Sequence, residues 1–189
     1  IAPPVARPFS RTYGEWAIAW WQWALATPAS VNPLLDPRSS TCDIGVQPAH
    51  VRFLGGNFGG GADDPPIERH CTVPAGTALF FPVLNGVWAS TPTPKHGCDV
   101  AGDPWYGTRP GDPGYRAFLN TIVKPAGIDP NNPKGSLTLS VDNVPIQGIE
   151  RRYLRSRVFF HALLAKYNIF DAILKADCFD RTNLSPNVA

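Results

Sequence analysis

The sequence predicts a mainly β fold, a β-sandwich of jelly-roll type with a Trp-rich helix at its N-terminus. Its 21 Pro and 17 Gly residues are scattered between short apolar runs of the 189-residue chain, which is typical of many short strands joined by turns. Residues 67–73 and 78–84 read as a hairpin around the turn 74–77. The second arm of this hairpin is too apolar to face water on both sides, which is typical of a strand inside a sandwich.

The composition is that of one domain spanning residues 1–189. Hydrophobic residues make up 43% of the chain, which is enough for a single core. A net charge of +2 with 17% charged residues provides no basic stripe for a phosphate backbone, so we expect no nucleic-acid partner. The longest apolar run, 16–26, is shorter than the roughly 20 residues that cross a bilayer, so we expect no transmembrane segment.

An N-terminal helical segment is predicted over residues 1–28. Ser10 is a suitable N-cap, the helix body runs over 12–26, and Pro28 ends it. Three tryptophans recur at the i, i+4, i+7 spacing of one helix face: Trp16, Trp20 and Trp23. Such a stripe could stack on sugars, but its helical spacing favours a buried core face over an exposed sugar-binding surface.

Two further strand regions follow from local patterns. Residues 50–54 alternate, so that Val51 and Phe53 share one face of the expected strand. Residues 136–149 read as a second hairpin, with an Asp-Asn turn at 142–143.

A long loop is predicted over residues 89–116, because Pro, Gly and Asp are dense there and disfavour regular structure. Long loops that carry aromatic and polar side chains are common sites of function. We therefore take five side chains in or beside this loop as candidate ligand-binding residues: Trp88, His96, Asp99, Trp105 and Tyr106.

The cysteines form an even set without any Cys-x-x-Cys pair, which predicts two disulfide bonds and not a zinc ribbon: Cys42, Cys71, Cys98 and Cys178. Three pairings satisfy this count. We favour Cys42 with Cys71, which bracket a predicted strand pair, and Cys98 with Cys178. Oxidised cysteines imply a secreted or extracytoplasmic protein. Because the chain holds no methionine, even at position 1, we expect Ile1 to follow a cleaved signal peptide.

One candidate metal site depends on strand pairing. If the strands at 50–54 and 67–73 pair, His50, Glu68 and His70 converge as a set that suits zinc or iron. The alternative is a polar surface facing solvent, because a one-residue slip of register separates the three side chains.

No motif assigns a catalytic residue or a cofactor, since the chain lacks the Gly-x-Ser-x-Gly elbow of serine hydrolases and any phosphate-binding loop. Asn183 begins a glycosylation sequon, which Pro186 weakens.

Three blocks of the chain are distinctive: Trp-Trp-x-Trp at 20–23, Asn-Pro-x-x-Asp at 32–36, and Cys-x-Val-Pro-Ala-Gly-x-x-Leu-Phe-Phe-Pro-Val-x-Asn at 71–85. Together they resemble a family of secreted, mostly bacterial proteins of unassigned function, and the resemblance covers most of the chain. It implies an N-terminal helix packed on a β-sandwich, and it carries no site residue across. It also implies a strand up to about Leu164, where the apolar period of 157–175 indicates a helix.

In that family, two strands follow a segment like 185–189. A chain ending there would leave sheet edges unpaired, so we expect one of two explanations: either the chain is processed or incompletely defined, or a strand donated by another chain completes the sheet. We therefore expect a disulfide-bonded binding or structural protein that takes a glycan or protein partner or joins an extracellular assembly. The alternative is an extracellular enzyme, either metal-dependent through the three residues above or carbohydrate-active at the long loop.

Overall fold

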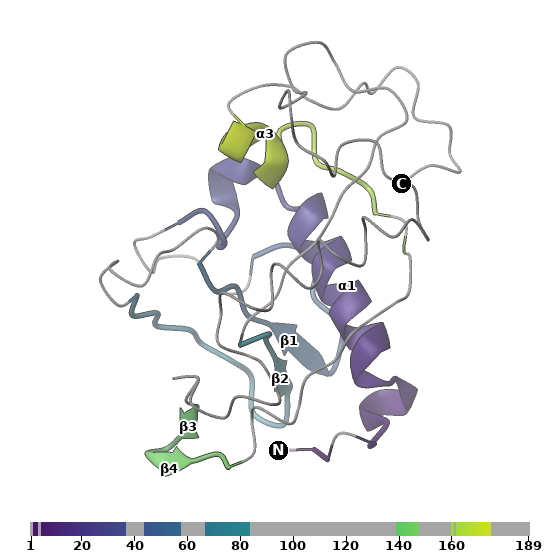
Figure 1. The fold of residues 1–189 in the computed structure, drawn as a ribbon, viewed down its shortest axis with the longest axis vertical. Helices are drawn as coiled ribbons and strands as arrows, with labels where there is room; N and C mark the ends of the chain where they lie inside the picture. Colours follow the sequence, from purple (N-terminus) through teal and green to yellow (C-terminus); the bar gives the residue numbers. More distant parts are fainter. Residues whose placement is uncertain are drawn as a thin grey trace, which may run out of the picture.

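The computed structural model describes residues 2–3, 5–36, 44–57, 67–83, 139–147, 160 and 162–174. Helix α1 (Tyr13–Ala26) runs through the molecule with strands β1 (Val51–Phe53) and β2 (Ala78–Phe80) beside it (Figure 1). Helix α3 (Ile169–Leu174) lies near its C-terminal end, and the hairpin of β3 (Ser140–Val141) and β4 (Val144–Pro145) lies at the opposite end of the molecule. Two 3-10 turns flank α1: η1 (Pro8–Ser10) and η2 (Ala29–Val31).

Helix α1 begins at a capping box formed by Thr12 and Glu15. The Thr12 hydroxyl oxygen accepts a hydrogen bond from the Glu15 backbone N–H at 3.2 Å, and the Thr12 N–H donates to the Glu15 carboxylate at 2.6 Å. The prediction that Ser10 is the N-cap was wrong. Ser10 lies in η1 with φ of 63°, outside the extended conformation of an N-cap, whereas Thr12 has φ −69° and ψ 163°.

The tryptophan stripe of α1 forms the core, as its spacing predicted. Trp16, Trp20 and Trp23 are 5%, 1% and 6% exposed. Their rings pack against β1, where Val51 and Phe53 are buried on the shared face expected of an alternating strand. The indole N–H groups stay paired in this core: for example, Trp20 donates to the carbonyl of Leu54 at 3.0 Å.

A buried amide completes the C-terminal end of α1. The Asn32 side-chain NH₂ donates to the carbonyls of Ala24 at 2.8 Å and Thr27 at 3.0 Å, which the helix leaves without partners. Its side-chain oxygen accepts from the Leu34 N–H at 3.1 Å. These contacts give a physical reason for Asn at the start of the Asn-Pro-x-x-Asp block, since one side chain closes the helix and orders the turn after it.

The two strands beside α1 pair in parallel, with Val51 opposite Ala78 and Phe53 opposite Phe80. The predicted hairpin of 67–73 with 78–84 was therefore wrong: in 67–83 only Ala78–Phe80 is a strand, and its partner is β1. The segment expected to be the first arm is held by Arg69 against the turns that follow α1 and β1. The Arg69 guanidinium donates to the backbone carbonyls of Pro33 at 2.7 Å, Asp36 at 2.9 Å and Gly56 at 2.9 Å.

The second predicted hairpin is confirmed in its centre. Strands β3 and β4 pair antiparallel, and Asp142 and Asn143 have φ of 51° and 63°, as a type I′ turn requires.

The prediction of a strand up to about Leu164 was wrong for the residues that can be judged, since 160 and 162–164 carry none. The Ala165 N–H donates to the carbonyl of Leu25 at 3.1 Å and so docks this stretch on the end of α1. Of the stretch 157–175, whose apolar period indicates a helix, the described residues that are helical are those of α3. Asn168 and Asp171 form a second capping box there, in which the Asn168 N–H donates to the Asp171 carboxylate at 3.0 Å.

Within these residues the strands form two separate two-stranded sheets, so the β-sandwich stays a prediction. None of the helices that the structure describes is both long and apolar enough to cross a membrane.

Candidate functional site

A surface groove lies where η1, one face of α1 from Trp16 to Trp23 and the segment before β1 meet. It has a volume of about 490 Å³, within the range of small-molecule sites. Aromatic side chains and a few polar groups line it, chiefly Phe9, Arg11, Trp16, Gln47, His50 and Phe53. We refer to this site as the groove.

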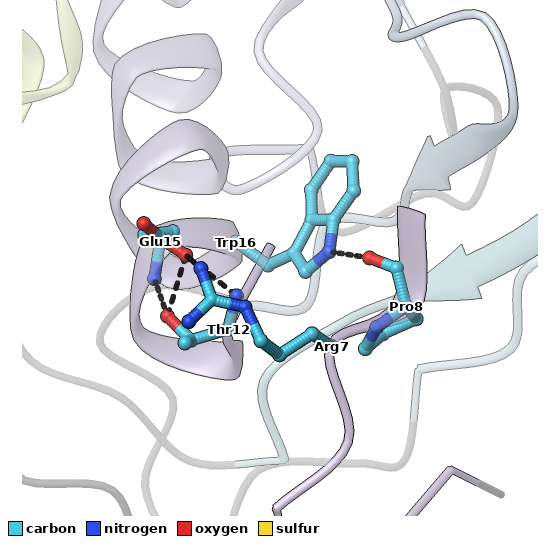
Figure 2. A network of polar contacts seen from close by, with 5 residues as sticks. All are labelled: Arg7, Pro8, Thr12, Glu15 and Trp16. Carbon is cyan, nitrogen blue, oxygen red and sulfur yellow. Dashed lines mark hydrogen bonds and ion pairs between the residues drawn. The ribbon is translucent and has the colours of Figure 1, made fainter. Parts of the chain in front are cut away.

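One wall of the groove is the turn η1, which a polar network fixes to α1. Figure 2 shows the Trp16 indole N–H donating to the carbonyl of Pro8, at 3.0 Å. In the same view the guanidinium of Arg7 lies 3.6 Å from the carboxylate of Glu15, which also accepts from Thr12. Hydrogen bonds from the Thr12 backbone and side chain, followed by the charges of Arg7 and Arg11, hold the pKa of Glu15 below its ordinary value of 4.5.

Phe9 stands in this wall in a conformation that few L-residues adopt. Its φ and ψ are 53° and 40°, and the next residue, Ser10, also has a positive φ of 63°. Residues held in the left-handed region cost of order 1 kcal/mol or more each, and they cluster at binding sites. The Phe9 ring is 49% exposed, stacked on His50 at 5.8 Å and edge-on to Trp16 at 6.4 Å between ring centroids. The strained turn thus presents a half-exposed aromatic ring to the groove.

Arg11 provides the charge beside this ring. Its guanidinium carbon lies 4.9 Å from the ring centroid of Trp16, a cation–π contact. No acceptor in the part of the chain that the structure describes hydrogen-bonds or ion-pairs with this guanidinium. Its N–H donors are therefore open to a ligand.

The opposite wall is held by Gln47, whose side chain behaves like a neighbouring strand. Its amide oxygen accepts from the Phe53 N–H at 2.9 Å, and its NH₂ donates to the Phe53 carbonyl at 3.4 Å. Both bonds lie on the edge of β1 that faces away from β2. At Phe53 this edge is therefore already occupied, so a donated strand would have to displace Gln47.

The candidate metal residues do not meet. Glu68 and His70 are close, with their side chains 3.5 Å apart, but they are 83% and 81% exposed. His50 lies in the groove instead, because β1 pairs with β2 and not with the segment that carries Glu68 and His70. Among the residues that the structure describes, no three His, Cys, Asp or Glu side chains are placed to hold a metal ion.

Cys71 forms a disulfide bond. The other residues singled out from the sequence lie outside the described residues: Cys42, Cys98, Cys178, Trp88, His96, Asp99, Trp105, Tyr106 and Asn183.

The groove itself was missed by sequence reasoning, although four of its residues were named for other reasons. Trp16, Trp23 and Phe53 were expected on buried or shared faces, and His50 was a candidate metal ligand. Nothing local in the sequence indicates that Phe9 adopts a left-handed backbone or that Gln47 bonds to β1. No family model, no curated protein and no solved structure matches this chain.

Proposed function

We propose that this chain is an extracytoplasmic binding protein that recognises a glycan through the groove. The observation that carries the proposal is the half-exposed Phe9 ring, held in a strained turn with polar side chains next to it. The disulfide bond at Cys71 and the even set of four cysteines support the extracytoplasmic location.

The chemistry of a sugar suits this surface. A pyranose has one face of C–H groups, which pack on an aromatic ring, and a rim of hydroxyls, which need hydrogen-bonding partners. In the groove the flat ring is Phe9, one face of which is stacked on His50, and the polar groups that line the groove with it include His50 and Arg11. Sites that bind small ligands combine these two features, apolar walls and a few placed polar groups.

The groove is also rigidly built, which favours binding because little ordering remains to be done when the ligand arrives. Trp16 fixes Pro8, the Thr12–Glu15 box fixes the start of α1, and Gln47 fixes the other wall to β1.

The test is a direct binding measurement against a panel of neutral and acidic oligosaccharides, by calorimetry and by Trp fluorescence. Phe9→Ala is expected to weaken the bound member at least about 10-fold, because it removes ring burial and stacking. Val5→Ala is the matched control: Val5 is an apolar residue of the same N-terminal segment, 91% exposed and outside the groove. No saturable binding to any member, or equal binding by wild type and Phe9→Ala, would overturn the proposal.

A second candidate function, a subunit of an extracellular assembly, rests on β2 and the residues after it. Three alternate residues there, Leu79, Phe81 and Val83, are 50%, 38% and 39% exposed, which gives an apolar stripe typical of contact surfaces. Sedimentation velocity over a wide concentration range tests it. Association that Leu79→Ser weakens supports this candidate, and a monomer at every concentration contradicts it.

The rival hypothesis of a carbohydrate hydrolase requires a pair of carboxylates at the scissile bond. The groove residues that the structure describes include no Asp or Glu.

A further inference from the structure

Among the described residues that line the groove, Arg11 is the one with a formal charge. Two of these described residues are basic, Arg11 and His50, and none is acidic. Arg11 is exposed and carries a full charge at any relevant pH. A ligand with a negative group beside its apolar face therefore complements the groove better than a neutral one.

The nearest described acid does not neutralise Arg11 by direct contact. The Glu15 carboxylate accepts hydrogen bonds from the Thr12 backbone N–H at 2.6 Å and the Thr12 hydroxyl at 2.8 Å. It also forms an ion pair with Arg7 at 3.6 Å. The charge of Arg11 acts on Glu15 at longer range, as the lowered pKa of that carboxyl reflects. In this arrangement Arg7 pairs with the acid of the helix, and Arg11 keeps its donors for the groove.

Arg11 and Phe9 lie against the same indole. The guanidinium carbon of Arg11 is 4.9 Å, and the ring centroid of Phe9 is 6.4 Å, from a ring centroid of Trp16. Both side chains also line the groove, so a ligand seated on Phe9 can meet the guanidinium through a substituent on its ring. A pyranose whose exocyclic carbon is oxidised to a carboxylate has a charged group in that position.

Resting on the proposed function, we infer that the groove is specific for an acidic sugar, a hexuronic acid residue whose carboxylate pairs with Arg11 while its C–H face packs on Phe9. The two coplanar oxygens of a carboxylate match two parallel N–H donors of a guanidinium, so the pair can be bidentate. His50, stacked on Phe9, supplies a further polar contact at the rim.

The experiment measures binding of trimers of galacturonic, glucuronic and mannuronic acid by calorimetry. Each acid is compared with its methyl ester, which keeps the ring and loses the charge, with its neutral hexose parent, and with a sulfated form of that parent. We expect at least one acid to bind about 10- to 100-fold more tightly than its ester, as charge-assisted bidentate pairs allow. The preference should fall as salt rises, because the contact is exposed.

Three arginine variants assign the effect to its residue. Arg11→Gln is expected to remove the preference for acid over ester, and Arg11→Lys to restore only part of it, because an ammonium keeps the charge and loses the paired geometry. Arg7→Gln is the matched control, since it removes the same charge from the neighbouring exposed arginine that pairs with Glu15. Arg11→Gln should lower the urea midpoint only slightly, because the side chain is exposed and its contact with Trp16 is a cation–π pair at the surface.

The outcomes separate this inference from the proposed function. Equal binding of acid and ester, a preference that Arg11→Gln leaves unchanged, or tighter binding of the sulfated sugar overturns the inference while leaving glycan binding standing. Absence of binding to every sugar overturns both.

Discussion

Both halves of α1 are rich in tryptophan, but they differ in whether the groups that cover these tryptophans are buried or exposed. In the C-terminal half, Trp20 and Trp21 are buried, and the end of the helix is closed by the buried amide of Asn32, whose NH₂ group and oxygen are both hydrogen-bonded. At the N-terminal end, Trp16 is covered by side chains that are themselves exposed, Phe9 and Arg11. Aromatic content alone therefore does not make a binding site. The site lies where the side chains that cover the aromatic core still have free faces or donors.

The capping boxes show the same contrast. Thr12 and Glu15 form theirs at the surface, with Glu15 exposed, whereas Asn168 and Asp171 are 0% and 1% exposed. A buried polar group that loses its partner costs more than an exposed one, because water cannot replace the lost bond. We therefore expect changes at the C-terminal end to affect stability, and changes at the N-terminal end to affect binding.

The largest expected effect is that of Asn32→Leu. It leaves the carbonyls of Ala24 and Thr27 and the Leu34 N–H without partners in the core, so we expect the free energy of unfolding to fall by about 2–4 kcal/mol. Urea unfolding followed by Trp fluorescence measures it. Asn57→Leu changes an exposed amide in the same way and should change little. Equal effects of the two variants would contradict the role of Asn32.

A smaller loss is expected from Gly55→Ala. An added Cβ would lie 2.8 Å from the Cβ and Cγ atoms of Pro33, so the turn after α1 must shift, at a cost of about 1–3 kcal/mol. The neighbouring variant Gly56→Ala is the control, because a Cβ there meets nothing within 4 Å. Thermal unfolding of the two variants side by side checks the prediction, and it is wrong if Gly56→Ala loses as much stability as Gly55→Ala.

The smallest expected effect is at the N-terminal end, where Glu15 titrates. Its folded pKa is lowered, so its contribution to stability is present above the unfolded value and is lost as the pH falls through the folded value, below 4.5. NMR titration of the Glu15 carboxyl should show that lowered pKa, and Thr12→Ala should bring it back toward 4.5. Glu15→Gln should unfold with a weaker pH dependence than wild type in this range. A Glu15 that titrates alike in wild type and Thr12→Ala would show that the hydrogen bonds of Thr12 do not set its pKa.

Local patterns predicted the elements that local interactions specify. The tryptophan period identified the buried face of α1, and Asp142-Asn143 identified the turn between β3 and β4. The N-cap could also have been read correctly, because Thr12 and Glu15 have the spacing of a capping box, and only the choice of Ser10 was wrong.

Local sequence patterns did not predict which distant segments pair with each other. The sequence of 67–84 fits a hairpin, but β2 pairs with β1, and Arg69 holds the preceding segment against the turns at Pro33, Asp36 and Gly56. The groove depends on contacts of the same kind. Phe9 meets His50, and Gln47 meets Phe53, only after the chain has folded, so neither pair has a signature in the sequence.

The most direct test of a glycan site at the N-terminal end of α1 is an NMR titration that follows side-chain N–H signals while the tightest-binding sugar of the panel is added. The indole of Trp16 and the side-chain amide of Gln47 line the groove, whereas the indoles of Trp20 and Trp21 lie outside it. If the sugar binds in the groove, the signals of Trp16 and Gln47 shift and those of Trp20 and Trp21 stay unchanged. Shifts confined to Trp20 and Trp21, or no shifts at saturating sugar, would contradict a glycan site there.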